Sequence, residues 1–327
     1  MTHTIKAAAI QFEAMAGDVA ANLKQLEHFI HTAAQNGAKI IAVPEFCTSQ
    51  LPMQEKVSNA VLPVDNPVAR RFRELAQKYQ CWIGGSMLIA ESGEIYNRYH
   101  LFEPSGQVHC HDKDYPTMWE GCFYTAGQDD GVFSTELGGV GAAVCWELIR
   151  NRTAKRMHNK VGLVITGTHW WSVPKNLWPL SWLLKGLGRT NHRLSKQAPS
   201  DLAKRLGVPV IQASHCGEFT SRLLLIPGLN ISIPYRTEFV GATQIVDGQG
   251  HVLASRDTAE GPGIVYADIS LGAQPASEPI GDTFWLPKLP WLIRAYWWQQ
   301  NACATPWYKR FGRTNGLNAA QKNKELK

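Results

Sequence analysis

The sequence predicts an α/β fold, which some schemes would class as α+β, built on mixed β-sheets. Three observations predict it: strand and helix signals alternate over the first eighty residues, a hairpin signal follows, and the second half repeats the theme more loosely. Two comparable units, each a sheet with helices on one face, would bury the apolar surface that this pattern creates. The hydrophobic content, 44% of 327 residues, is ample for such a core.

The first half predicts a βαβαβ run. Residues 5–12, "IKAAAIQF", predict a strand, and 19–33 predict a helix because apolar residues recur at helical spacing until Gly37. "AKIIAVPEF" and "CWIGGSML" predict the next two strands, with a helix between them that starts at Asn66 and Pro67. "EIYNRYHLF" and "QVHCHDK" flank the turn "EPSGQ", which predicts a hairpin and makes the sheet mixed.

The second half predicts a strand that ends at Cys145, a helix over about 147–160, and strands in "VGLVITGT" and "VPVIQASH" with the helix "SDLAKRLG" between them. "FVGATQIVDGQGHVLASR" and "GIVYADI" predict a closing hairpin and a last strand. These elements define one domain over 1–270. Residues 174–197, with Trp178 among basic residues, are expected to be an inserted Trp-rich excursion.

Composition narrows the function classes. The net charge of +6 is concentrated at the end of the chain, where 309–327 carry six Lys or Arg and one acid, so the body is close to neutral and nucleic-acid binding has little support. Seven cysteines without paired CxxC spacing fit neither a disulfide framework nor a structural zinc site, and they indicate a reducing compartment. With no leader-like start and no run of about 18 apolar residues, we expect a soluble, cytoplasmic protein.

Three predicted strands end in polar groups that a core would not select. Glu45 closes "IIAVPEF", Lys113 closes "VHCHDKDYP" and Cys145 closes "GAAVCWE". Open α/β sheets collect reactive groups at the carboxyl ends of their strands. A carboxylate can take the proton of a thiol, and an ammonium can stabilise the thiolate and a developing oxyanion. The alternative is that Cys145 is a buried small hydrophobe and that both charged groups are solvated.

The three motifs together carry a family resemblance. "VPEF" with Glu45, "HDKDYP" with Lys113 and "AVCWE" with Cys145, in that chain order, resemble the nitrilase superfamily of carbon–nitrogen hydrolases over about residues 5–270. The resemblance implies a four-layer α-β-β-α sandwich with two mixed sheets face to face, homodimers or larger homo-oligomers, and a Glu-Lys-Cys catalytic set without metal or organic cofactor. It also implies a second glutamate that orients the substrate, and "WEGCFYTAG" supplies Glu120.

On this resemblance we expect hydrolysis of a non-peptide carbon–nitrogen bond of a small molecule. Glu45 would take the proton of Cys145, and Lys113 with the backbone N–H of Trp146 would stabilise the tetrahedral species. An amide would give an acid plus ammonia or an amine through a thioester. Conversion of a nitrile to an acid and ammonia, or N-carbamoyl hydrolysis, are the alternatives, because Glu147 in Cys-Trp-Glu resembles the nitrilase branch while the glycine-rich sequence that nitrilases usually carry around the second glutamate is missing.

The substrate pocket is expected to be aromatic. His169, Trp170 and Trp171 in "GTHWWSVP" stand where the superfamily places substrate contacts, and Trp119 precedes the second glutamate. This composition indicates an apolar or aromatic acyl group. The alternative is that these tryptophans pack the sandwich or a dimer interface.

Two other constellations were weighed against the Glu-Lys-Cys set. His109 and His111 lie on one face of a strand and offer two metal ligands, but no third ligand is identifiable, so we expect no metal site. A Cys-His-Asp hydrolase would combine Cys145 with His215 and Asp201, which would leave Glu45 and Lys113 unexplained.

The last segment, 271–327, is expected to be a C-terminal extension. "FWLPKLPWLIRAYWWQQ" followed by basic residues resembles interfacial membrane anchors, but Pro287 and Pro290 interrupt its helical stripe. Superfamily members commonly wrap such extensions around a partner subunit, so an oligomer contact is favoured, with a basic end that need not be ordered. A membrane-surface or scaffold protein that keeps the fold without turnover is the non-enzymatic alternative. The substrate, the branch and the oligomer size stay open.

Overall fold

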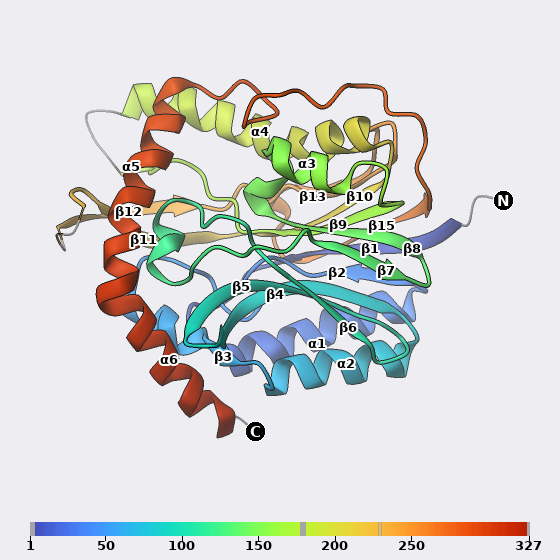
Figure 1. Cartoon of the computed structure of the whole chain (residues 1–327), viewed down its shortest axis with the longest axis horizontal. Helices are drawn as coiled ribbons and strands as arrows, with labels where there is room; N and C mark the ends of the chain where they lie inside the picture. The colour runs from blue at the N-terminus through green and yellow to red at the C-terminus, as the bar shows by residue number, and fades with distance from the viewer. Residues whose placement is uncertain (1–3, 177–180, 228, 230, 326–327) are drawn as a thin grey trace.

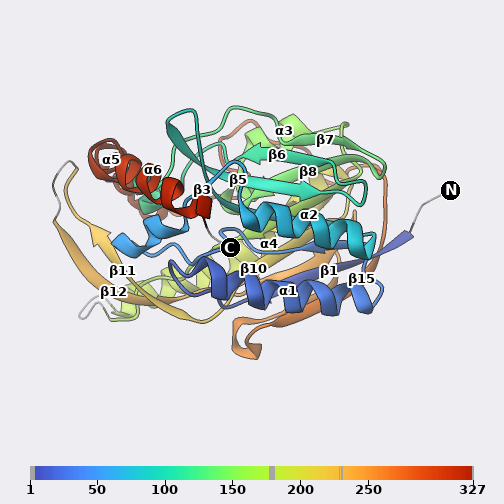
Figure 2. The same cartoon turned by 90° about the horizontal axis from the view of Figure 1, so that it is seen from below.

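The chain forms four stacked layers in the order helix, sheet, sheet, helix (Figure 1). The computed structural model describes residues 4–176, 181–227, 229 and 231–325. Helices α1 (Val19–Gln35) and α2 (Pro67–Tyr79) cover one sheet, and α3 (Asn151–Met157) and α4 (Ser181–Leu206) cover the other. The view from below shows α1 and α2 side by side on the outer face (Figure 2). The predicted α-β-β-α sandwich is therefore confirmed.

The first sheet is mixed, as the sequence predicts. Its strands run in the order β6-β5-β4-β2-β1, and β15 lies antiparallel to β1. The pairs β1–β2 and β2–β4 are parallel, whereas β4, β5 and β6 form antiparallel hairpins. Its strands are β1 (Thr4–Phe12), β2 (Ile40–Ala42), β3 (Leu62–Pro63), β4 (Trp82–Glu91), β5 (Glu94–Phe102), β6 (Val108–Asp112) and β15 (Gly263–Ser270).

The second sheet has a parallel centre and antiparallel edges. Strands β8, β9 and β10 are parallel, β7 pairs with β8, and β13 and β14 extend the sheet beyond β10. The two sheets join where the end of β1 pairs with the end of β10. Its strands are β7 (Val132–Thr135), β8 (Gly138–Val144), β9 (Leu163–Thr168), β10 (Val210–His215), β13 (Thr243–Val246) and β14 (Val252–Arg256), and β11 (Glu218–Leu224) and β12 (Ser232–Glu238) form a separate hairpin.

Most predicted elements are present, and the main errors lie where tertiary contacts interrupt a helix. The helix expected over 147–160 is divided into the 3₁₀ helix η3 (Cys145–Ile149) and α3. Arg150 stands between them in an extended conformation, because its backbone bridges to Trp285 and its guanidinium is buried against Asp114. Strand β7 and the β11–β12 hairpin were not predicted from the sequence.

The predicted excursion over 174–197 is only partly separate from the fold. Helix α4 begins at Ser181 and continues to Leu206, so much of this segment is the first half of an outer-layer helix. It also incorporates the expected helix "SDLAKRLG". Residues 177–180, which include Trp178, lie outside the described residues.

The C-terminal extension packs against its own chain. Helices α5 (Trp291–Trp307) and α6 (Arg313–Lys322) run along one side of the sandwich (Figure 1), and η6 (Asn323–Glu325) follows. The Tyr308 hydroxyl donates to Glu94 Oε2 at 2.6 Å, and Asn323 Nδ2 donates to the Val61 carbonyl at 2.8 Å. The basic end is thus helical as far as residue 325, and a contact with another subunit stays a prediction.

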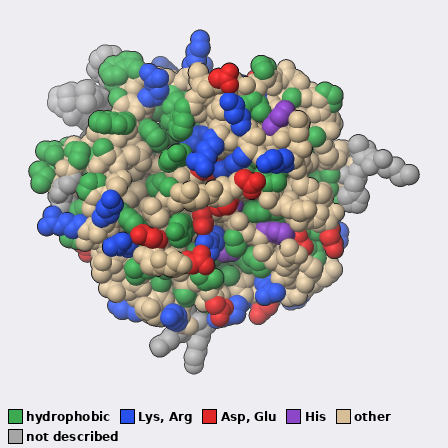
Figure 3. All heavy atoms as spheres, viewed as in Figure 1, with side chains coloured by type: hydrophobic (Ala, Val, Ile, Leu, Met, Phe, Trp, Pro, Cys, Tyr) green, Lys and Arg blue, Asp and Glu red, His purple; other side chains and the backbone are tan. Residues whose placement is uncertain are grey.

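Hydrophobic side chains remain exposed on this side of the molecule. Figure 3 shows them around α5 and the β11–β12 hairpin. Trp291 and Trp298 of α5 are 68% and 69% exposed, and Ile226, Leu229 and Ile231 are exposed at the tip of the hairpin. Within the described ranges, no helix is long and apolar enough to cross a bilayer.

Candidate active site

Glu45, Lys113 and Cys145 are all fully buried at the ends of different strands. Glu45 follows β2, Lys113 directly follows β6, and Cys145 directly follows β8. The Lys113 ammonium lies 2.8 Å from Glu45 Oε1, and the Cys145 thiol is near enough to the Glu45 carboxyl to offset part of the rise in its pKa that burial causes. The three groups that the sequence places on separate strand ends are therefore gathered in one buried cluster.

The Glu45 carboxyl is held at both oxygens. Asn97 Nδ2 donates to Oε1 and the backbone N–H of His169 donates to Oε2, each at 2.8 Å. The strand β9 approaches so closely that a Cβ at Gly167 would lie 2.3 Å from the Glu45 nitrogen, so only glycine fits there. These contacts fix the direction in which the carboxyl faces Cys145.

Glu120 completes the cluster from the 3₁₀ helix η2 (Met118–Cys122). Its Oε2 accepts hydrogen bonds from Lys113 Nζ at 2.8 Å, from the Tyr124 hydroxyl at 2.6 Å and from the Thr117 N–H at 3.1 Å. The other oxygen, Oε1, is buried and has no hydrogen-bond partner among the described residues. A buried carboxylate oxygen without a partner is costly unless a bound molecule satisfies it.

Backbone strain gathers at the same place. Phe46, Met118 and Cys145 have positive φ angles of 49°, 60° and 55°, and they are half of the non-glycine positions where this occurs among the described residues. Phe46 directly follows Glu45, Met118 lies two residues before Glu120, and Cys145 carries the thiol. The left-handed conformation costs a side-chain-bearing residue about 1–2 kcal/mol, and such strain clusters at functional sites.

Burial and mutual charge set the protonation of the cluster. Burial raises the pKa of Glu45, the charge of Lys113 opposes this, and Glu120 raises it further, so that it comes to about 7. Burial, followed by the nearby Glu45 carboxylate, raises the pKa of Cys145 well above its ordinary value, which keeps the thiol neutral at rest. Burial alone would lower the pKa of Lys113, but Glu120 and Glu45 hold it well above its ordinary value.

Glu147 connects the segments that carry Lys113 and Cys145. Its fully buried carboxylate accepts hydrogen bonds from the Val144 N–H at 2.7 Å and from the Asp114 N–H at 3.0 Å. Val144 directly precedes Cys145, and Asp114 directly follows Lys113. Glu147 therefore sets the relative position of two strand ends.

Two cations keep Glu147 charged. His111 Nε2 lies 3.0 Å and Arg156 Nη2 lies 3.1 Å from its oxygens. Although burial alone would raise the pKa of Glu147, Arg156 and His111 hold it well below its ordinary value. For His111, burial would lower the pKa, but Glu147 and Asp129 raise it to about 9. From the sequence, Glu147 served only to mark the branch of the family. Its position as a charged residue three places after an apolar strand was the signal that could have indicated this positioning role.

The competing constellations are not assembled. His109 contacts Glu103 and His111 contacts Asp129 and Glu147, and no group of three or more His, Cys, Asp or Glu in the described part of the chain is arranged to hold a metal ion. His215 Nε2 lies 2.6 Å from the Glu45 carbonyl, so the ring supports the Glu45 backbone. Asp201, on the outer helix α4, lies near Arg205.

A small cavity is lined by chain neighbours of the cluster, although Glu45, Lys113, Glu120 and Cys145 are not themselves in its lining. Its volume is about 70 Å³, and its walls include Met118, Trp146, Trp170 and Trp171. Trp119 and His169, also expected in the pocket, are not part of this lining. Their polar atoms bind the backbone of Leu51 instead, Trp119 Nε1 at its carbonyl and His169 Nε2 at its N–H, so they hold the segment after Glu45.

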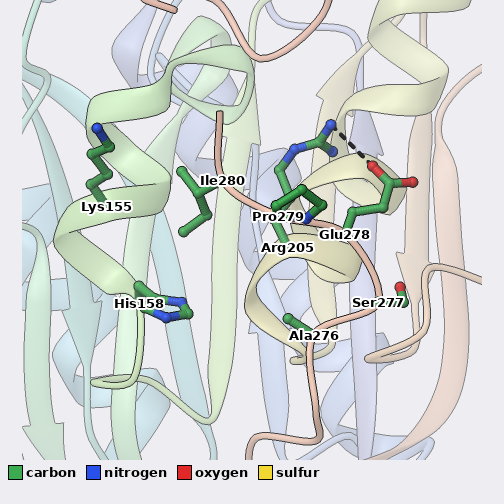
Figure 4. Close-up of a pocket in the computed structure, with 8 residues that line it drawn as sticks. All are labelled: Lys155, His158, Arg205, Ala276, Ser277, Glu278, Pro279 and Ile280. Carbon is green, nitrogen blue, oxygen red and sulfur yellow. Dashed lines mark ion pairs between the residues drawn. The ribbon is translucent and has the colours of Figure 1, made fainter. Parts of the chain in front are cut away.

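A larger hollow lies away from the cluster. It measures about 600 Å³ and lies beside α3, α4 and residues 276–280. Figure 4 shows Lys155, His158 and Arg205 around it, with Arg205 paired to Glu278 at 3.0 Å. Lys155 is paired to Asp282 at 3.0 Å, so both of its long cations already have partners.

The chain is similar in sequence to several known proteins. The sequence profile of the family described as Carbon-nitrogen hydrolase matches residues 6–274. The chain is 29% identical to Nitrilase 3 of Arabidopsis thaliana over 167 residues, which is 44% of this chain and 48% of that protein. It is 30% identical to a cyanide hydratase of Neurospora crassa over 159 residues, or 43% of this chain and 45% of that protein. The chain thus spans about half the length of the curated relatives that it matches.

Solved structures share the fold at lower identity. A carbon–nitrogen hydrolase from Helicobacter pylori G27 superimposes with a TM-score of 0.66 at 19% identity, covering 82% of this chain and 90% of that chain. An amidase from Nesterenkonia sp. gives a TM-score of 0.60 at 18% identity, covering 86% and 94%. At these identities the likeness establishes the common sandwich.

Proposed function

The chain belongs to the carbon–nitrogen hydrolase family, and from this premise we propose that it is a cysteine hydrolase that forms a thioester on Cys145. As a family member it acts on carbon–nitrogen bonds other than peptide bonds. The observation that carries the proposal is the burial of Cys145 in one cluster with Glu45 and Lys113, whose charged groups are paired at 2.8 Å. These side chains supply a nucleophile, a base and an electrophilic group for acyl transfer.

With an amide, the first half-reaction forms the thioester. Cys145 Sγ attacks the carbonyl carbon while Glu45 takes the thiol proton, and the negative charge on oxygen is stabilised by Lys113 and by the backbone N–H of Trp146. Glu45 then gives the proton to the nitrogen, the carbon–nitrogen bond breaks, and ammonia or an amine leaves. A pKa of about 7 suits Glu45 for accepting and returning one proton near neutral pH.

Water completes the cycle. It attacks the thioester carbon and gives a proton to Glu45, the carbon–sulfur bond breaks, and the proton returns to the thiolate as the acid leaves. Glu120 is suited to hold the substrate nitrogen or this water, because its Oε1 is buried and unpaired among the described residues. Lys113 and Tyr124 anchor its other oxygen.

A nitrile is the second candidate substrate. The Cys-Trp-Glu sequence at Cys145 and the similarity to a nitrilase and a cyanide hydratase favour it. Attack on the nitrile carbon forms a thioimidate, with the thiol proton delivered to nitrogen through Glu45. Water then adds to that carbon before ammonia leaves, and the resulting thioester is hydrolysed as above.

N-carbamoyl hydrolysis has less support when the substrate is an N-carbamoyl amino acid. Such a substrate carries a carboxylate that needs a cation, yet the described residues that line the small cavity are uncharged. Arg150, an arginine close to Cys145 in the chain, is fully buried and paired with Asp114. We therefore propose a small uncharged amide or nitrile.

Intact-protein mass spectrometry tests the reaction class. The full chain is mixed with a library of amides, nitriles and N-carbamoyl compounds, and we expect a transient mass increase equal to the acyl group together with ammonia release. Cys145→Ala is the matched control and must show neither. Ammonia release that persists in Cys145→Ala would contradict the mechanism.

We propose that the chain forms a homodimer or larger homo-oligomer, which the exposed Trp291 and Trp298 support. We also propose a cytoplasmic location, which the seven free cysteines favour because disulfides are rare in reducing compartments.

A further inference from the structure

Helix α5, which belongs to the C-terminal extension, lies against the candidate site. It contacts η2, the 3₁₀ helix that carries Glu120, and it contacts β11 (Figure 1). Ile293 and Tyr296 of α5 line the cavity of about 70 Å³ together with Trp146 and Trp170. A segment from beyond the family domain, which ends near residue 274, thus forms part of the wall beside the catalytic residues.

Other residues that line this cavity lie close in the chain to the candidate catalytic residues. Trp146 directly follows Cys145, Met118 lies two residues before Glu120, and Trp170 follows the residue whose N–H binds the Glu45 carboxyl. The four site side chains do not themselves line the cavity, but three of its lining residues stand next to or close to them in the chain. We therefore take this cavity as the space toward which an acyl group on Cys145 extends.

Hydrogen bonds from α5 and from the segment just before it hold the helix against the rest of the fold. Gln300 Nε2 donates to the Leu224 carbonyl at 2.6 Å, and Leu286, shortly before the helix, donates its N–H to the Ile149 carbonyl at 2.8 Å. A Cβ placed at Gly121 would meet Ala304 Cβ at 3.2 Å, so helix and η2 touch closely. Such a packed wall resists displacement by a bulky substrate.

The size and the chemistry of the cavity indicate what fits. A volume of about 70 Å³ is well below the roughly 300–1,000 Å³ of sites for drug-sized ligands. It is lined by indole, phenol and aliphatic groups, and Tyr235, Tyr296 and Asn191 supply the polar edges. This favours the apolar acyl group over the aromatic one among the two expected from the sequence, because the aromatic side chains of the wall leave little room for an aromatic ring in the substrate.

We propose that Ile293 and Tyr296 are the specificity-determining wall of the acyl pocket, and that they restrict this protein to short, uncharged acyl groups of a few carbon atoms. The inference rests on the proposed hydrolase function. Ile293 and Tyr296 are three residues apart, so they project from the same face of α5 into the cavity. The C-terminal extension is then part of the substrate site of its own subunit.

Substrate-length profiles test this wall. The values of kcat/KM are measured for acetamide, propionamide, butyramide and benzamide and for the matching nitriles, with the full chain and with Ile293→Ala and Tyr296→Ala. Each variant should raise the butyramide-to-acetamide ratio by about tenfold or more, because one methylene in an apolar pocket changes kcat/KM by about 10–200-fold. Arg294→Ala is the matched control, since Arg294 is exposed on the same helix and should leave the ratio unchanged.

Two results separate this inference from the proposed function. A wild-type chain that hydrolyses acetamide or acetonitrile while both alanine variants keep its length profile overturns the wall and leaves the function standing. A wild-type chain that forms no acyl adduct with any amide or nitrile overturns both. Should an alanine variant fail to fold, Ile293→Phe tests the opposite direction: it narrows the pocket, and propionamide must lose more kcat/KM than acetamide does, or the wall is wrong.

Discussion

The ammonium of Lys113 lies 2.8 Å from Glu45 Oε1, and both side chains are fully inaccessible to solvent. The same ammonium lies 2.8 Å from Glu120 Oε2, so one cation neutralises two buried carboxyl groups. Removing a single partner from such a cluster leaves uncompensated charge in a low-dielectric interior. Stability and catalysis are therefore expected to depend on the same contact.

Replacing Lys113 by Met should lower both activity and stability. We expect kcat to fall by about 10²–10³-fold, because an electrophilic group at the developing oxyanion is lost. The free energy of unfolding should fall by about 3–5 kcal/mol, since Glu45 and Glu120 would face one another without a cation. Denaturant unfolding and steady-state kinetics measure the two effects.

A surface pair provides the control for Lys113→Met. Lys155 and Asp282 also form an ion pair, at 3.0 Å, but their side chains are 53% and 97% exposed. Lys155→Met should change stability by less than about 1 kcal/mol and leave kcat unchanged. Equal losses in the two variants would contradict the buried-cluster interpretation.

The acid limb of the pH profile should report Glu45. Below its pKa of about 7 the carboxyl is protonated and cannot take the proton of Cys145, so kcat/KM should rise with pH through about 7 and then level off. A neutral amide or nitrile is used so that the substrate does not titrate. An acid limb centred below pH 5 would show that a less perturbed carboxyl is the base.

From the positive φ angle of Cys145 we predict the relative stability of two inactive variants. Cys145→Ala and Cys145→Gly should both be inactive, but the glycine variant should be the more stable by about 1 kcal/mol, because only glycine adopts φ near +55° without steric cost. Thermal unfolding compares them at one pH. A glycine variant that is clearly less stable than the alanine variant would argue against strain at this corner.

Glu147→Gln should reduce kcat much more than it changes KM, by about tenfold or more. Glutamine offers only one acceptor oxygen, so the N–H groups of Val144 and Asp114 can no longer both be satisfied and the two strand ends shift. Glu74→Gln is the control, because Glu74 is 62% exposed on the surface. An unchanged kcat in Glu147→Gln would mean that this carboxylate has no positioning role.

The pH dependence of stability gives Glu147→Gln a second readout. In the wild type, the lowered pKa of Glu147 means that its carboxylate stabilises the fold at pH values above 4.5, the ordinary pKa of the group. This stabilisation is lost as the pH falls through the lowered pKa. The raised pKa of His111 means that its imidazolium stabilises the fold fully below pH 6.5. This stabilisation is lost as the pH rises through about 9. Both losses should diminish in Glu147→Gln, since each depends on the same pair of charges.

The exposed tryptophans of α5 predict self-association. Light scattering should find the wild-type chain as a homodimer or larger homo-oligomer, and the double variant Trp291→Ser with Trp298→Ser should dissociate, because these side chains are 68% and 69% exposed. A monomeric wild type would contradict the oligomer. Liposome flotation that depends on the same two residues would favour the membrane-surface alternative.

The candidate catalytic groups could be picked out because each lies at or near the end of an apolar strand. Lys113 and Cys145 come directly after their strands and Glu45 three residues after β2, and α/β sheets collect reactive groups at the carboxyl ends of strands. Glu120 was found only through the resemblance, since a glutamate in a loop has no periodic signal of its own. Asn97 and Tyr124 were missed, because a polar residue among apolar neighbours does not show which distant group it contacts.

By itself, the sequence determined an α/β chain with mixed sheets and most of its strands and helices, since periodicity and strand ends are local properties of the chain. Its motifs, through the family resemblance, also implied the four-layer sandwich and the candidate nucleophile, base and cation. Only the tertiary structure decided that helix 147–160 breaks at Arg150, that Glu147 joins two catalytic strand ends, and that α5 closes the pocket beside Trp146. These features depend on burial and on contacts between residues far apart in the chain. A linear pattern does not encode the distance between Ile293 and Met118, whereas the packed layers bring both to one cavity of about 70 Å³.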